Sequence, residues 1–107
     1  MVGLCLTGPA AAVECTFTTE CFEGESCMET SFDMEIDDTD GARKLITPAE
    51  TIRVVLGGSN ATRVYTGFTD SAFHLLSRGA DGTARYTNHL TQGPMVVSYL
   101  GTCKEPS

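Results

Sequence analysis

The side chains with the most distinctive chemistry in this sequence are its five cysteines, Cys5, Cys15, Cys21, Cys27 and Cys103. Five residues separate Cys15 from Cys21 and again Cys21 from Cys27. That spacing fits neither a zinc site nor the Cys-x-x-Cys of redox catalysts. An even number of cysteines in a small exported chain is typical of a disulfide framework. We therefore expect structural disulfides among the four cysteines that follow Cys5.

Four cysteines allow three pairings, and the sequence favours Cys21–Cys27 together with Cys15–Cys103. Gly24 lets the short segment between Cys21 and Cys27 turn back on itself, which places these two side chains opposite each other. The Cys15–Cys103 bond would join the first strand to the last. In the chain-entropy model, closing a loop of that length adds about 4 kcal/mol to the free energy of unfolding.

A second candidate site lies on a predicted hairpin, formed by residues 72–78 and 83–90 around the turn signal Asp81-Gly82. Alternation predicts that its solvent face carries two histidines and two arginines, His74, Arg78, Arg85 and His89, together with Leu76 and Thr87. The opposite face, expected to join the core, carries Phe73, Leu75, Ala84, Tyr86 and Leu90.

The length of the turn decides what these four polar residues can do. A two-residue turn would place His74 opposite His89 and Arg78 opposite Arg85, whereas a four-residue turn would offset both pairs. Like charges directly opposite each other repel, so the first register would indicate an anion or a metal between them. The alternative is an ordinary solvated face, because two histidines are fewer ligands than zinc usually needs.

No pattern in the sequence indicates an enzyme. None of the serines stands in a Gly-x-Ser-x-Gly elbow, and oxidised cysteines leave no thiolate nucleophile. The acidic run 37–41 cannot supply the carboxylates that an EF-hand needs at its first and last positions, so a polar turn is expected there. We expect no catalytic residues, no bound metal and no cofactor.

Charge is distributed unevenly along the chain, whose net charge is -7. Residues 13–40 hold ten acidic side chains and no Lys or Arg, while residues 41–107 hold four acids and seven bases. An acidic chain is a poor partner for nucleic acid. The acidic half could attract a cationic partner, or it could simply be solvated strand faces that pair with bases on neighbouring strands.

The first twelve residues carry no charged side chain and end in three alanines, after which the chain becomes polar. This pattern is typical of the last part of a secretory signal peptide, with cleavage after Ala12, and the alternative is an ordinary first strand. We expect residues 1–12 to be a signal-peptide remnant and residues 13–107 to be a periplasmic or secreted domain. No apolar run approaches the roughly 20 residues that cross a bilayer, so no membrane span is expected.

Period-two alternation predicts strands, and no stretch sustains a helical period. The predicted strands include residues 32–37, 51–56, 64–68, 72–78, 83–90 and 95–100. Turn signals such as Asp40-Gly41 and Gly57-Gly58 separate them. The sequence thus predicts one all-β domain, an antiparallel meander of seven or eight strands closed as a small barrel or sandwich.

The early cysteines and the closing segment Tyr99-Leu100-Gly101-Thr102-Cys103 resemble those of small exported bacterial proteins of unassigned function. The chain is also similar to the periplasmic inhibitors of c-type lysozyme, which are small barrels that insert a Ser-Gly-x-x-Tyr loop into the lysozyme cleft. Its nearest segment, residues 81–86, has Asp81 in place of the serine and one additional residue before Tyr86. The resemblance implies a barrel and transfers no functional residue.

These observations together predict an exported, non-enzymatic binding domain whose partner is a basic extracytoplasmic protein such as a lysozyme. The alternative hypothesis is a barrel that binds a small ligand or a metal through the face with His74 and His89. The sequence leaves the oligomeric state open.

Overall fold

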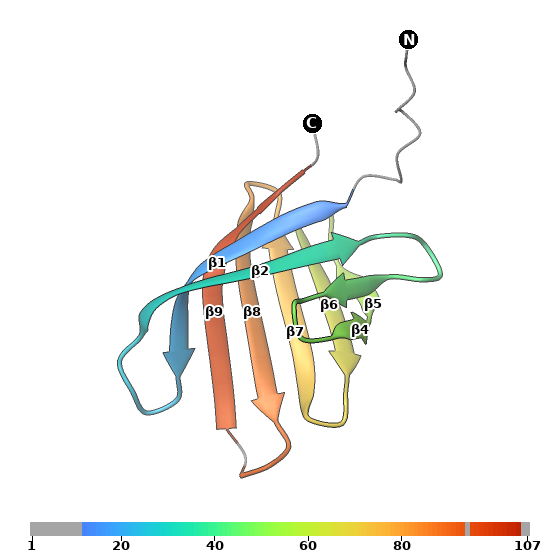
Figure 1. Ribbon diagram of the computed structural model, residues 1–107. Coiled ribbons are helices and arrows are strands. Elements are labelled where there is room, and N and C mark those ends of the chain that lie inside the picture. Colours follow the sequence, from blue (N-terminus) through green and yellow to red (C-terminus); the bar gives the residue numbers. More distant parts are fainter. Residues whose placement is uncertain (1–11, 94, 106–107) are drawn as a thin grey trace.

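The computed structural model describes residues 12–93 and 95–105, which form nine antiparallel strands and contain no helix (Figure 1). In chain order the strands are β1 (Val13–Phe22), β2 (Met28–Asp37), β3 (Lys44–Ile46), β4 (Thr51–Arg53), β5 (Val55–Gly58), β6 (Thr62–Phe68), β7 (Ala72–Gly79), β8 (Thr83–Leu90) and β9 (Met95–Lys104). The predicted all-β class is confirmed. No helix in this part of the chain has the length and apolar character needed to span a membrane.

The strands form one sheet in the order β4-β3-β2-β1-β9-β8-β7-β6-β5, so the first strand pairs with the last. The two edge strands of this order, β4 and β5, are consecutive and are separated only by Val54. One bent segment therefore pairs first with β3 and then with β6. Of the two predicted architectures, the sheet adopts the barrel, which is nearly closed (Figure 1).

The closure brings β4 close to β6. A Cβ at Gly67 would collide with the carbonyl oxygen of Arg53, which explains a glycine inside a strand. The N–H of Val54 donates to the carbonyl oxygen of Arg43 at 3.1 Å. The predicted strand 51–56 is therefore interrupted at Val54, where the chain changes partners.

Alternating side chains of every strand fill the barrel. The buried apolar set consists of Val13, Cys15, Phe17, Met34, Ile36, Leu45, Ile52, Val54, Tyr65, Ala72, Leu76, Ala84, Tyr86 and Val97. Four aromatic rings meet at its centre, since Phe17, Phe32, Tyr86 and Tyr99 have ring centroids 4.9 to 6.2 Å apart. Aromatic contacts at such distances stabilise a core beyond the area they bury.

Two disulfides join the strands, and both predicted pairings are confirmed. Cys15 lies directly opposite Cys103 where β1 pairs with β9, and the two residues are 88 positions apart in sequence. The Cys21–Cys27 bond spans the β1–β2 hairpin. The predicted signal-peptide remnant lies outside the described residues, apart from Ala12.

Candidate functional site

The β7–β8 hairpin has a register that neither predicted turn would give. Three residues, 80–82, separate the two strands, and Gly82 adopts a φ of 92°. The N–H of Gly82 donates to the carbonyl oxygen of Gly79 at 3.0 Å, as in a three-residue hairpin turn. His74 consequently lies opposite Asn88, and Arg78 lies opposite Ala84.

This register corrects the predicted hairpin site. His74 and Arg78 face the barrel interior, whereas Arg85 and His89 lie on the outside, so the four residues do not share one face. A shift of one residue in register turns every side chain of a strand to the other face. Because β7 has apolar residues on both faces, its sequence does not determine which face is buried. Of the predicted core face, Ala84 and Tyr86 are buried, Leu90 is partly buried, and Phe73 and Leu75 point outward.

His74 is buried and fully hydrogen-bonded. Its exposed fraction is 1%, its Nδ1 lies 2.7 Å from the Tyr86 hydroxyl and 2.9 Å from the Asn88 amide oxygen, and its Nε2 lies 2.9 Å from the Thr69 hydroxyl. Burial raises the pKa of Tyr86 above its usual value of 10.0. These contacts make His74 a structural histidine, and within residues 12–93 and 95–105 no group of His, Cys, Asp or Glu has a metal-binding arrangement.

A cluster of charges, which the sequence did not indicate, lies around Asp38 in the β2–β3 loop. Its carboxylate accepts from Arg43 Nε at 2.5 Å and from the Tyr65 hydroxyl at 2.9 Å. Guanidinium nitrogens of Arg63 and Arg78 lie 3.6 and 4.0 Å away. Burial raises the pKa of Asp38, but the hydrogen bonds from Arg43 and Tyr65 outweigh it and hold the pKa below its usual value.

We expect the substitution Asp38→Asn to lower the free energy of unfolding at pH 7 by about 2 kcal/mol, because it removes the carboxylate shared by three guanidinium groups. A carboxyl group whose pKa falls on folding stabilises the fold above its unfolded pKa, and this stabilisation is lost as the pH falls through the folded value. The difference between wild type and variant should therefore shrink below the ordinary pKa of 3.8.

Urea unfolding at pH 7, 4 and 2.5 measures this difference. Asp70→Asn provides the control, since Asp70 is exposed and its side chain has no hydrogen bond or ion pair within the described residues. A difference between wild type and Asp38→Asn that is the same at all three pH values would contradict the assigned role of the carboxylate.

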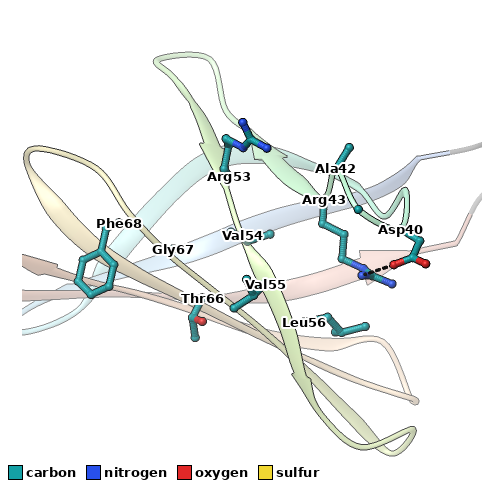
Figure 2. A pocket seen from close by; sticks show the side chains of 11 residues that line it. Asp40, Ala42, Arg43, Arg53, Val54, Val55, Leu56, Thr66, Gly67 and Phe68 are labelled. Atoms are coloured by element: carbon teal, nitrogen blue, oxygen red, sulfur yellow. Dashed lines mark hydrogen bonds and ion pairs between the residues drawn. The ribbon is translucent and has the colours of Figure 1, made fainter.

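A groove of about 670 Å³ opens between the β2–β3 loop and the bent β4–β5 segment (Figure 2). In this view Arg43 extends to Asp40 on one side of the segment, and Phe68 lies on the other. Among the described residues, Val55 and Phe68 are the most exposed large apolar side chains, at 68% and 77%. The lining combines the charged side chains of Asp40, Arg43 and Arg53 with the apolar Val54, Val55, Leu56 and Phe68.

The outer face of β1 and β2 carries an acidic hollow of about 510 Å³, whose lining includes Glu14, Asp33 and Glu35 and contains no basic residue. Glu14 and Glu35 lie directly opposite each other, and Asp33 lies opposite Thr16 on the next outward-facing pair. Among the described residues, these three carboxylates take part in no ion pair or side-chain hydrogen bond.

The other acids of residues 13–40 are divided between paired and solvated positions. Asp37 pairs with Lys44, while Asp38 and Asp40 bind Arg43. Pairing between strands therefore accounts for part of the acidic half, as one of the two interpretations expected. The lining of the acidic hollow contains no basic residue, although Lys104 on β9 is the cross-strand neighbour of Glu14.

No protein-family model matches this chain, and neither the curated proteins nor the solved structures contain a significant match. The fold is a small, nearly closed barrel with two disulfides, and small barrels host many unrelated functions.

Proposed function

We propose that this protein is an exported, non-enzymatic binding domain that captures a cationic protein through the acidic hollow on β1 and β2. The observation that carries the proposal is the set of three carboxylates, Glu14, Asp33 and Glu35, which line a depression without a basic neighbour in its lining. None of the three forms an ion pair among the described residues, so a lysine or arginine side chain of a partner could pair with them.

The facing carboxylates of Glu14 and Glu35 support this interpretation. Like charges directly opposite each other destabilise a sheet, and the neighbouring Lys104 on β9 offsets this repulsion on the Glu14 side only. A cationic group placed between them would remove that repulsion. The two disulfides are compatible with an oxidising extracytoplasmic compartment, where a basic partner such as a lysozyme would be encountered.

Binding to a c-type lysozyme, used as a basic probe, tests the proposal. We expect Glu14→Gln/Glu35→Gln to raise the Kd about tenfold, because each lost carboxylate removes roughly 0.5–1 kcal/mol of charge pairing. The Kd of the wild type should also rise steeply with salt, since exposed charges are screened over about 8–10 Å. Isothermal titration calorimetry at several salt concentrations measures both effects.

The matched control is Glu25→Gln/Asp70→Asn, which changes the net charge equally at two exposed loop positions away from the hollow. We expect its Kd to stay near that of the wild type. An equal loss of affinity in both double variants would show that only net charge matters, and affinity independent of salt would rule out a cationic partner.

A further inference from the structure

Two arginines face each other inside one end of the barrel. Arg63 on β6 and Arg78 on β7 are direct cross-strand partners, and both point inward, as their neighbours Tyr65 and Leu76 do. Two positive groups opposite each other repel unless anions lie between them. The carboxylates that lie near the two arginines therefore indicate which kind of ligand this site can bind.

Asp38 neutralises this pair only in part. Its carboxylate is 2.5 Å from Arg43 but 3.6 Å from Arg63 and 4.0 Å from Arg78, so its short contact is with Arg43. A second carboxylate, that of Glu105, forms an ion pair with Nη1 of Arg78. Among the residues that the structure describes, the other carboxylates within ion-pair distance of the three guanidinium groups are those of Asp38 and the exposed Asp40.

The two partners of the Arg78–Glu105 ion pair differ in burial. The Arg78 side chain is 11% exposed, whereas that of Glu105 is 69% exposed and follows the last residue of β9. The Nε of Arg78 is buried and has no hydrogen-bond partner among the described residues. The guanidinium group is thus fixed and incompletely satisfied, while the carboxylate that reaches it can exchange with solvent.

A hollow of about 300 Å³ adjoins these groups. Its lining consists of Asn60, Arg63, Arg78, Gly79, Ala80, Gly82, Cys103 and Glu105. Since a water molecule takes about 30 Å³ of liquid volume, this space can hold a carboxylate with a short substituent. The β7–β8 turn forms one wall, and Cys103 holds it in place by donating its N–H to the carbonyl oxygen of Gly82.

We propose that this hollow, the Arg63–Arg78 pocket, binds the carboxylate group of an external ligand, and that Glu105 occupies the site when the ligand is absent. A planar carboxylate matches the fork of guanidinium N–H donors, and Arg78 already donates to the carboxylate of Glu105. The ligand is either a small organic acid or the C-terminal carboxylate of a peptide chain. The pocket is separate from the acidic hollow, so it does not rest on the proposed function.

Titration with sodium acetate at constant ionic strength tests the proposal. Binding is followed by the NMR signal of the Arg78 Nε–H and by the melting temperature, with sodium chloride as the reference salt. Glu105→Gln removes the internal competitor, so we expect it to bind acetate at least about fivefold more tightly than the wild type. Glu25→Gln, which has the same charge change at an exposed turn, should bind acetate as the wild type does.

Arg63 provides the second variant, because its side chain is one-third exposed and its removal should leave the barrel folded. Glu105→Gln/Arg63→Gln should lose the acetate response. The proposal is wrong if acetate affects Glu105→Gln no more than chloride does, or if wild type and Glu105→Gln bind acetate equally.

A further titration distinguishes the two ligand sources. N-acetyl-glycylglycine and its C-terminal amide differ only in the carboxylate. Tighter binding of the free acid than of acetate would identify a peptide C-terminus, and equal binding would identify a small organic acid. Equal binding of the free acid and the amide would overturn the proposal, because the carboxylate would then contribute nothing.

Discussion

Replacing both Cys15 and Cys103 by alanine is expected to lower the free energy of unfolding by about 4 kcal/mol. This bond closes a loop between residues 88 positions apart, and such a long loop restricts the unfolded chain strongly. It also fixes the pairing of β1 with β9, on which closure of the barrel depends. Since small domains are stable by about 5–15 kcal/mol, the loss should be visible in urea unfolding.

The Cys21→Ala/Cys27→Ala variant provides an internal comparison. Its loop spans only 6 positions, so the same model assigns the bond about 2 kcal/mol. The expected order is therefore wild type, then the variant without Cys21–Cys27, then the variant without Cys15–Cys103. The opposite order of the two variants would show that the long loop does not control stability.

The second large effect is expected at the centre of the barrel. Phe17 is 0% exposed and its ring lies within 6.2 Å of the rings of Phe32, Tyr86 and Tyr99. Phe17→Ala would leave a cavity that these rings cannot fill and should cost about 3–5 kcal/mol. Thermal and urea unfolding of the oxidised protein measure this cost.

Phe68→Ala makes the same chemical change at a residue that is 77% exposed. We expect it to alter the free energy of unfolding by no more than about 0.5 kcal/mol. If the Phe17 variant were as stable as the Phe68 variant, the aromatic cluster would not be the stabilising centre of the core.

Much of the fold was predictable because local signals agree with the global arrangement. Residues 32–36 alternate apolar and acidic side chains, and they form part of β2 with Met34 and Ile36 buried. Gly24 lies between the cysteines of the short disulfide, and its φ of 82° suits the turn that joins them. Each of these features depends on residues within a few positions of one another.

The face of β7 was not predictable in the same way. Ala72 and Leu76 alternate with Phe73 and Leu75, so both faces of this strand are apolar and periodicity cannot choose between them. The choice depends on a turn of three residues, whereas Asp81-Gly82 is compatible with turns of several lengths. Because the turn has three residues rather than two, His74 lies opposite Asn88 instead of His89, and the two histidines are on different faces of the hairpin.

The charge cluster around Asp38 also lacks a sequence signal. Tyr65 reaches Asp38 from 27 positions away, and Arg78 comes from the strand after that of Tyr65. Only closure of the barrel brings the β2–β3 loop beside β6 and β7. The residues of the Arg63–Arg78 pocket are likewise brought together by the register of β6 and β7 and by the end of β9.

The pairing of β1 with β9 also has a kinetic consequence. The other neighbouring strands of the sheet are consecutive in sequence, so they can associate as soon as both have been synthesised. The β1–β9 ladder must wait for the whole chain, and contacts between residues so distant in sequence form slowly. Until that ladder forms, β1 has an unpaired edge able to pair with other chains, which exposes the incompletely folded protein to aggregation.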